Sequence, residues 1–340
     1  MTALVYPFML IQSSGSKTFS SLGRFIGKSA DTVKRLLQPK AISRLLLNKF
    51  AQHVFAKDRK LSLVVDDTLI CKIFSKVMCG TWWFFSAKDG VERLAFKLQI
   101  YVLTNGIYAI PIGCDFLFSK DFIEDPGQQV IELIDAQMKH VQEMFPNKHI
   151  ILTADGAFSS RRILKWAINN NIDLVMRMHS NRVVKYNGIR QRLTEISQLI
   201  PLGRHSRKTI QAFWYDMPLY IISWKRINKN GKESVVFLVS TFKAKPVEYT
   251  NIYEGRWYIE KKIRTSKQSY GLQDCQSTNM SVQLDHMHAV LVAYAITQVV
   301  MKKCHVKVPE DAKRWIQAQE NYYQKKSFNA LDRIFKNGSL

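Results

Sequence analysis

The order in which β-rich and helix-like segments alternate between residues 61 and 180 constrains the fold of this chain most. The apolar, β-branched run LSLVV (61–65) is followed by two β-rich runs within residues 94–117, on either side of Asn105-Gly106, a dipeptide that signals a two-residue hairpin turn. After these come a helix-like segment (127–145), the strand-like run HIILTA (149–154), a second helix-like segment (158–170) and a strand-like run within residues 171–180. Hairpin-joined strands together with strand–helix–strand units predict an α/β fold with a mixed sheet flanked by helices.

Carboxylates follow two of these predicted strands. Asp66 and Asp67 come directly after the first run, and Asp155 follows HIILTA; each then meets a turn-like or polar residue. An Asp at the end of a buried strand lies at the rim of a sheet, where open α/β sheets place ligands, and carboxylate oxygens are ligands that Mg²⁺ prefers. For any single Asp in such a position, a helix-capping or turn role is the alternative.

A third acidic position lies in the segment 251–272, which the sequence predicts to be one helix. This segment carries four side chains that could serve a function. Counted from the first, they lie at offsets of three, seven and fourteen residues: Tyr253, Arg256, Glu260 and Lys267. At roughly 100° per residue they fall within an arc of about 60° on one helix face, beside an apolar stripe of Ile252, Ile259 and Ile263. One acid flanked by cations suits a site that holds a metal and phosphates. The alternative is a solvated amphipathic helix with i,i+4 pairs such as Arg256–Glu260.

Taken together, three motifs resemble the IS4-superfamily DDE transposases. They are the DDT at 66–68, the strand followed by DG at 154–156, and the Y-x2-R-x3-E-x6-K pattern over 253–267, which is the family's complete YREK signature. The resemblance covers roughly residues 60–300 of the chain. It implies an RNase H-like mixed sheet, two divalent metal ions (Mg²⁺, for which Mn²⁺ would substitute), and cleavage and joining of transposon ends.

The same resemblance implies roles for individual residues. Asp66, Asp155 and Glu260 would be the catalytic, metal-binding triad, with Asp67 as the alternative to Asp66, because adjacent residues of a strand point to opposite faces. A further set would contact the DNA strand near the cut: Tyr253, Arg256 and Lys267.

The charge of the whole chain agrees with a nucleic-acid partner. Fifty Lys and Arg residues against 27 Asp and Glu give a formal charge of +23 over 340 residues, and phosphate contacts dominate nucleic-acid affinity. A basic protein without such a partner is the alternative. The apolar run 289–301 is too short to cross a bilayer and is typical of a core helix, and residues 3–11 lack the charged flank of a signal peptide. Five scattered cysteines form no C-x-x-C pair, so we expect reduced thiols in a cytoplasmic, nucleoid-associated bacterial protein.

Residues 18–37 resemble a helix-turn-helix. Leu22, Phe25 and Ile26 share one helix face, Gly27 would end that helix, and residues 29–37 would form a recognition helix that carries Lys34 and Arg35 as DNA contacts. An ordinary helical pair packed on its neighbours is the alternative.

These observations predict five parts of the chain. A helical DNA-binding region (1–55) precedes the first part of the RNase H-like core (56–180), an inserted β-rich subdomain (181–234), the second part of the core with the Glu260 helix (235–308) and a basic tail (309–340). Within the insertion, basic loops beside Trp214 and Trp224 suit DNA contact, although a core role for either Trp is an equal alternative.

The predicted function is that of a cut-and-paste transposase acting on double-stranded DNA, at the terminal inverted repeats of its own element and at target DNA. We expect a homodimer in the synaptic complex. The alternatives are an RNase H-fold nuclease that cuts without joining, a transposase-derived DNA-binding protein without catalysis, and a transcription regulator with a small-ligand domain. The YREK face argues against the regulator, because a sensor domain does not need it.

Overall fold

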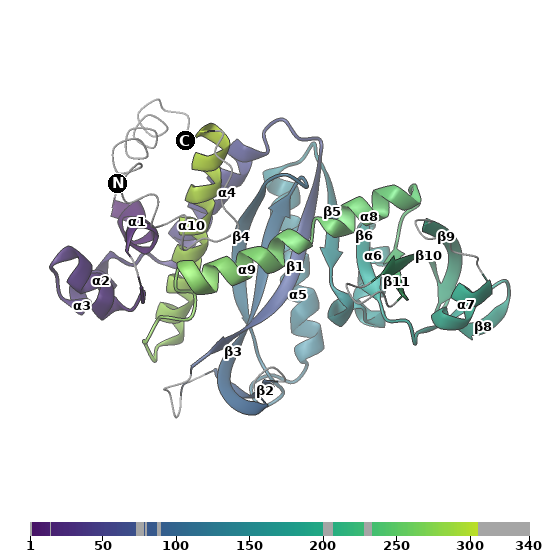
Figure 1. Cartoon of the computed structure of the whole chain (residues 1–340), viewed down its shortest axis with the longest axis horizontal. Coiled ribbons are helices and arrows are strands. Elements are labelled where there is room, and N and C mark those ends of the chain that lie inside the picture. The colour runs from purple at the N-terminus through teal and green to yellow at the C-terminus, as the bar shows by residue number, and fades with distance from the viewer. Residues whose placement is uncertain are drawn as a thin grey trace.

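A large mixed sheet forms the centre of the molecule, with helices on both of its faces (Figure 1). The computed structural model describes residues 2–13, 15–72, 78, 80–86, 90–199, 207–227 and 233–304. The strands are β1 (Lys60–Cys71), β2 (Trp82–Ser86), β3 (Val91–Thr104), β4 (Ala109–Leu117), β5 (His149–Ala154), β6 (Leu174–Met178), β7 (Val183–Tyr186), β8 (Ile189–Arg192), β9 (Arg207–Trp214), β10 (Met217–Ile227) and β11 (Glu233–Ser240). They join in the order β2-β3-β1-β5-β6-β11-β10-β9-β7-β8, with β4 paired to β3.

Helices are distributed before, between and after these strands. In chain order they are α1 (Val5–Gln12), α2 (Phe19–Ile26), α3 (Ala30–Leu36), α4 (Lys40–Val54), α5 (Pro126–Met144), α6 (Arg161–Asn169), α7 (Leu193–Leu199), α8 (Pro246–Glu254), α9 (Trp257–Ser269) and α10 (Met280–Cys304), with short 3₁₀ turns η1 (Thr2–Leu4) and η2 (Gly156–Phe158). β1, β5 and β6 are parallel neighbours, and β1–β3, β3–β4 and β6–β11 are antiparallel. The predicted α/β fold with a mixed sheet flanked by helices is therefore confirmed.

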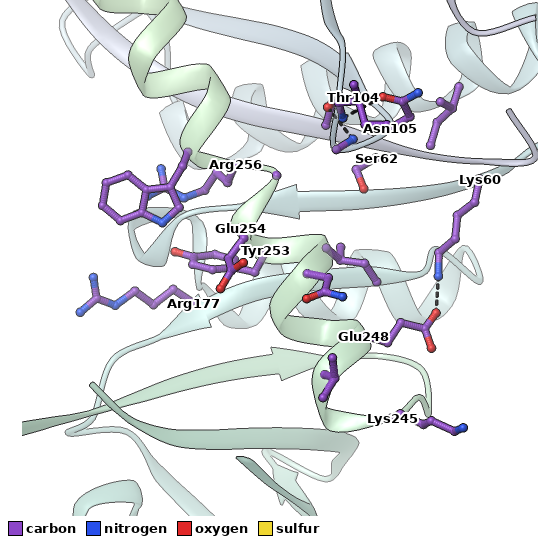
Figure 2. A pocket seen from close by; sticks show the side chains of 18 of the residues that line it. Lys60, Ser62, Thr104, Asn105, Arg177, Lys245, Glu248, Tyr253, Glu254 and Arg256 are labelled. Atoms are coloured by element: carbon purple, nitrogen blue, oxygen red, sulfur yellow. Dashed lines mark hydrogen bonds and ion pairs between the residues drawn. The ribbon is translucent and has the colours of Figure 1, made fainter. Parts of the chain in front are cut away.

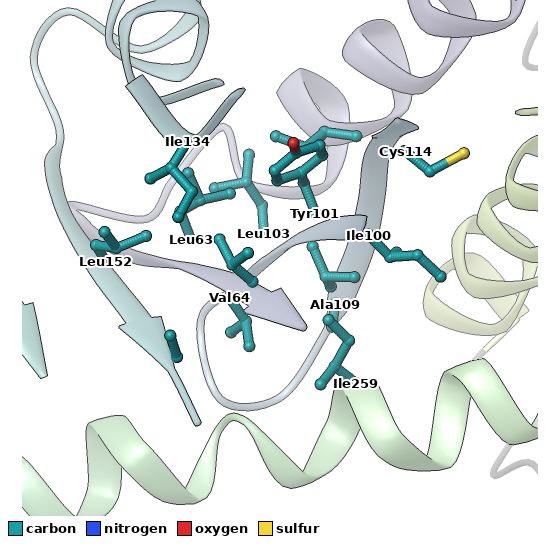
Figure 3. Packing of buried hydrophobic residues seen from close by; sticks show 14 of the residues in the cluster. Leu63, Val64, Ile100, Tyr101, Leu103, Ala109, Cys114, Ile134, Leu152 and Ile259 are labelled. Atoms are coloured by element: carbon teal, nitrogen blue, oxygen red, sulfur yellow. The ribbon is translucent and has the colours of Figure 1, made fainter. Parts of the chain in front are cut away.

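Alternating residues of the central strands separate two apolar layers. Leu63 of β1 points toward Ile134 of α5, whereas its neighbour Val64 points toward Ile259 of α9 (Figure 3). On β5, Ile151 belongs to a separate cluster with Val175, Leu238 and the α8 residues Tyr249 and Tyr253, which lies on the face opposite α5. α8 and α9 thus cover the sheet face that carries every second residue of β1, including Asp66.

The first strand is longer than the sequence indicated. A turn was expected at Asp67-Thr68, but β1 continues to Cys71 because it keeps pairing with β3 as far as Cys71 opposite Ala95. Its parallel pairing with β5 stops at Val65 opposite Ala154. Asp66 consequently lies inside a strand, at the point where one of its two neighbours ends.

The hairpin between β3 and β4 also differs in detail. The dipeptide Asn105-Gly106 was expected to form a two-residue turn, and the connection is four residues long, with Thr104 paired to Ala109. The side-chain oxygen of Asn105 accepts hydrogen bonds from the backbone N–H groups of Ile107 and Tyr108 at 3.0 and 2.8 Å. This local side-chain turn opens the wider loop. A true two-residue turn occurs instead at Asn187-Gly188, where both residues have positive φ, 49° and 82°.

The single helix predicted over residues 251–272 is wrong: the segment forms two helices, α8 and α9, separated at Gly255-Arg256. Around this break the backbone bonds tighten to a three-residue spacing, from Arg256 N to Tyr253 O and from Ile259 N to Arg256 O, both at 2.9 Å. The predicted apolar stripe divides accordingly, because Ile252 packs in the α8 cluster whereas Ile259 and Ile263 pack in the main core.

The predicted β-rich insertion continues the central sheet. β11 pairs with β6, and β10 and β9 extend the sheet outward to β7 and β8. The strand expected at 235–242 corresponds to β11 at Glu233–Ser240. Trp214 is buried in the core, and Trp224 packs on the α8 cluster. The expected loop at 228–232, most of the loop at 203–208 and the tail 309–340 lie outside the described residues.

Buried polar contacts fasten the N-terminal helices to the turn that follows α9. The backbone N–H of Lys17 donates to Asp274 Oδ2 at 2.6 Å, and Tyr6 hydroxyl donates to His286 Nδ1 at 2.7 Å. His286 Nε2 in turn donates to the carbonyl of Gly271 at 2.8 Å. Gly271 has φ +70°, and a Cβ there would lie 2.3 Å from the Cβ of Lys17, so only glycine fits.

The apolar run 289–301 lies within α10, which packs against α4 and β4. Most of its side chains between His286 and Val299 are buried. Within the described ranges, no helix is both long and apolar enough to cross a membrane.

Candidate active site

Two of the predicted acids are brought together by strand register. Because Val65 of β1 is opposite Ala154 of β5 in a parallel pair, the next residues along the two strands, Asp66 and Asp155, are neighbours. Asp155 follows β5 directly, and its Oδ1 accepts a 2.7 Å hydrogen bond from the N–H of Ala157 at the start of η2. The capping role that is the usual alternative for such an Asp is therefore present here, and it orients the side chain while a second oxygen stays available.

Asp66 and Asp67 have opposite surroundings. Asp67 faces away from α9 and forms a 2.8 Å ion pair with Lys97 of β3. Asp66 lies on the α9 side, and its Oδ1 accepts a 2.9 Å hydrogen bond from the backbone N–H of Asp67. Of the two candidates for the first acid, Asp66 is the one that shares a face with the segment carrying Arg256 and Glu260.

Arg256, at the break between α8 and α9, links two of the predicted acids. Its Nη1 lies 3.4 Å from Asp66 Oδ2, and its Nη2 donates to Glu260 Oε1 at 2.6 Å. The side chain is only 8% exposed, and that of Asp66 13%, against 38% for Glu260. The guanidinium also lies over the rings of two neighbours, 5.4 Å from that of Tyr253 and 6.0 Å from that of Trp257.

The protonation of Asp66 is unusual. Its pKa is raised to about 7, chiefly by burial and also by the nearby charge of Asp155, although Arg256 and the hydrogen bond from Asp67 act in the opposite direction. One guanidinium at 3.4 Å thus does not compensate for the burial of this carboxylate. The site still favours an additional positive charge.

Tyr253 lies at the end of α8 and is 6% exposed. Burial raises the pKa of its phenol, and the charge of nearby Arg177 lowers it. Figure 2 shows the Arg177 side chain beside Tyr253 on the floor of the site. Arg177 was not among the residues predicted from the sequence, although a signal existed: it is the only charged, exposed residue in β6, whose other four residues are buried.

Lys267 lies farther along α9 and is bound to the backbone. Its Nζ donates to the carbonyl of Leu69 on β1 at 2.7 Å, and burial lowers its pKa. From Asp66 to Leu69 the strand advances roughly 10 Å, and from Glu260 to Lys267 the helix also advances roughly 10 Å. α9 therefore runs alongside β1, and Arg256 and Lys267 contact the strand at two points about that far apart.

Some of these residues line an open cleft of about 1300 Å³, among them Arg177, Tyr253, Arg256 and Glu260 (Figure 2). The loop from Thr104 to Ile107 and α8 also line this cleft. Near Lys60 the cleft is edged by an ion pair between that lysine and Glu248. The cleft is lined by cations, acids and aromatic rings, a composition suited to a charged polymer.

The side chains of Asp66, Asp155 and Glu260 are of the type that binds a divalent metal ion. They offer hard oxygen ligands, and the raised pKa of Asp66 shows that its buried charge lacks a full counter-charge. In the described part of the chain, however, no three Asp, Glu, His or Cys side chains are grouped closely enough to hold a metal ion. Between two of these carboxylates, those of Asp66 and Glu260, lies the guanidinium of Arg256.

The predicted DNA contacts Lys34 and Arg35 lie elsewhere. Both side chains are exposed on α3, and Arg35 Nε donates to the carbonyl of Asp31 at 3.3 Å. α2 ends at Gly27, which has φ +66°, and Ser29 caps α3 by accepting from Thr32 N–H. The helix pair that the sequence predicted is present, at the end of the molecule opposite α7, β8 and β9 (Figure 1).

Comparison with known proteins agrees with this geometry. The family model described as the transposase DDE domain matches residues 127–296, which is half of the chain and includes Asp155 and the whole of α8 and α9. No curated protein matches the chain. A central mixed sheet with acids on neighbouring strands, and the family match over the segment that carries the remaining site residues, together show that this chain belongs to the family of transposases with a DDE domain.

Proposed function

We propose that this protein is an IS4-type transposase that cleaves DNA at the terminal inverted repeats of its element and joins the freed ends to target DNA. The observation that carries the proposal is the meeting of Asp66, Arg256 and Glu260 near Asp155, where Arg256 and Glu260 also line an open cleft. Residues 190 positions apart in the chain meet there. A structural ion pair alone would not need a cleft large enough for a nucleic-acid strand.

Asp66, Asp155 and Glu260 would hold divalent metal ions, Mg²⁺ or Mn²⁺. Bound there, the ions would activate the attacking oxygen and stabilise the leaving oxygen of a phosphodiester. Arg256 would bind a phosphate of the DNA strand and keep the scissile bond in line. Tyr253 would support Arg256 through its ring, and Arg177 would contact the strand beside it.

The reaction we propose has two stages. Water attacks the phosphodiester at the transposon end and leaves a free 3′-hydroxyl. That hydroxyl then attacks a phosphodiester of target DNA, which forms one new bond and breaks another, so no covalent protein intermediate is needed.

Binding of the DNA would involve two further surfaces. α3 would place Lys34 and Arg35 against duplex DNA, and the basic strands β7–β9 lie at the opposite end of the molecule (Figure 1). A duplex bound along the long axis would contact both surfaces and the cleft. Two copies, each holding one transposon end, would form the synaptic complex.

The test is cleavage and strand transfer with duplexes that carry the inverted repeats flanking the gene. Asp155→Asn keeps the oxygen that caps η2 but removes a charged ligand, so we expect cleavage to fall at least about 100-fold, close to 3 kcal/mol of barrier, with DNA binding unchanged. Asp67→Asn is the matched control, because Asp67 faces away from the site. Cleavage within about tenfold of wild type for Asp155→Asn would remove this residue from catalysis. Cleavage without joining by the wild-type protein would indicate a nuclease instead.

A further inference from the structure

The guanidinium of Arg256 occupies the position that a cation bound by both Asp66 and Glu260 would occupy. It contacts one oxygen of each carboxylate, at 3.4 and 2.6 Å, and it is nearly buried. Two positive centres cannot share that place, because a divalent ion bound by both carboxylates would lie within a few ångströms of the guanidinium and be repelled. In this arrangement the protein supplies its own counter-cation.

The hydrogen bonds that hold the guanidinium of Arg256 are incomplete. Its contact with Asp66 is long for a charge-assisted hydrogen bond, and its Nε is buried without a hydrogen-bond partner. The rings of Tyr253 and Trp257 beside it provide a surface along which a planar group can move without losing contact. Trp257 is 45% exposed, so this path leads toward solvent at the cleft.

We propose that Arg256 is an internal competitor of the metal: in the DNA-free protein it neutralises Asp66 and Glu260, and a phosphate of the bound DNA strand draws it away. The inference rests on the proposed function, since it assumes that these carboxylates are the metal ligands. Its consequence is a coupling of the two binding events, in which DNA raises the affinity for metal and, by linkage, metal raises the affinity for DNA. Without DNA the site binds metal more weakly, which limits metal-dependent chemistry in the wrong context.

Metal binding without DNA tests this coupling. Free Mn²⁺ is measured by electron paramagnetic resonance during titration of the full-length, DNA-free protein. Arg256→Gln is expected to bind Mn²⁺ about tenfold more tightly than wild type, the size expected for freeing a carboxylate from one charge-assisted hydrogen bond. Arg256→Lys keeps a cation beside Asp66 but cannot bridge both acids, so it should lie between the two and preserve the fold if Arg256→Gln does not.

Arg264→Gln is the matched control. It removes the same charge from an exposed position on α9, and Mn²⁺ affinity should change less than twofold if the effect of Arg256 is one of position and not of net charge. Equal tightening in both variants, or none in either Arg256 variant, would overturn the inference.

Asp66→Asn separates this inference from the proposed function. If Asp66→Asn abolishes Mn²⁺ binding while the Arg256 variants bind like wild type, the carboxylates hold the metal and only the competition is refuted. If Asp66→Asn binds Mn²⁺ as wild type does, the proposed metal site itself is wrong.

Discussion

Asp66 and Asp67 show how two identical neighbours acquire different chemistry. The period of two in a strand sends one toward α9 and the other toward Lys97. The DDT pattern predicted that one acid of this dipeptide belongs to the site. Which of the two acids faces Arg256 depends on which side of β1 the later helices cover, and that information lies almost two hundred residues away.

The raised pKa of Asp66 predicts a pH-dependent stability. A carboxyl whose folded pKa is about 7, against 3.8 in the unfolded chain, binds more protons when folded, so stability is lost as pH rises between these values. Asp66→Asn removes the ionisation and keeps an oxygen for the N–H of Asp67. In metal-free buffer, the variant should therefore gain roughly 2–3 kcal/mol on wild type between about pH 5 and pH 8.

Urea unfolding at several pH values measures this difference. Asp67→Asn is the control, because it breaks the ion pair with Lys97 and should lower stability slightly. A stability difference between Asp66→Asn and wild type that stays constant with pH would show that the carboxyl of Asp66 is not held in the uncharged form.

At the scale of elements, the positions of strands and helices followed from apolar runs and their breaks, whereas their ends and connections did not. Among the hairpin connections that the structure describes, Asn-Gly occurs twice and makes a two-residue turn once. Asn105 uses its side chain locally and also donates to Asp58 at 2.9 Å. Helix periodicity likewise put four functional residues on one helix. Periodicity could not show that the apolar face of a twisted sheet has two separate packing sites, one for α8 and one for α9.

The turn after α9 yields a prediction about how elements are held together. Gly271→Ala would combine the strain of φ +70° with a clash against the stem of Lys17, which anchors the N-terminal helices through Asp274. We expect a loss of at least about 3 kcal/mol of stability. Gly188→Ala is the matched control: its φ is +82° with nothing within 4 Å of a Cβ, so it should cost only about 1–2 kcal/mol.

Thermal or urea unfolding of the two variants compares them directly. Equal losses would mean that the backbone strain alone matters and that Lys17 moves aside freely. A larger loss for Gly271→Ala, with earlier proteolysis within residues 13–18, would show that the N-terminal helices detach from the core.

At the scale of the whole molecule, the feature of interest is where the basic residues lie along the fold. The chain has a net charge of +23, and α3, which carries Lys34 and Arg35, lies at the opposite end of the molecule from the basic strands β8 and β9 (Figure 1). Composition predicted the polyanion but not this distribution, because the insertion was expected to form a separate subdomain and instead prolongs the central sheet. In the proposed function, α3 and the basic strands β7–β9 would together give an extended surface for a duplex.

The salt dependence of binding tests that surface. If six or more phosphates are contacted, the association constant for duplex DNA should fall at least about 1000-fold between roughly 50 and 200 mM salt. Fluorescence anisotropy with a labelled duplex measures it in the absence of divalent ions. A fall of less than about tenfold would contradict an extended electrostatic interface and would favour contact through α3 alone.

The distance along the chain between Asp66 and Arg256 also bears on how the protein is made. β1 leaves the ribosome early, but β11 must pair with β6 after the whole excursion through β7–β10, and only then can α8 and α9 settle on the sheet. Such long-range pairing forms slowly, because the entropy cost of closing a long loop comes before the stabilising contacts are made. A growing chain can therefore bring Asp66, Arg256 and Glu260 together only after β11 has paired with β6. The order of synthesis would thus keep the proposed site unassembled until the whole of α9 (Trp257–Ser269) has emerged.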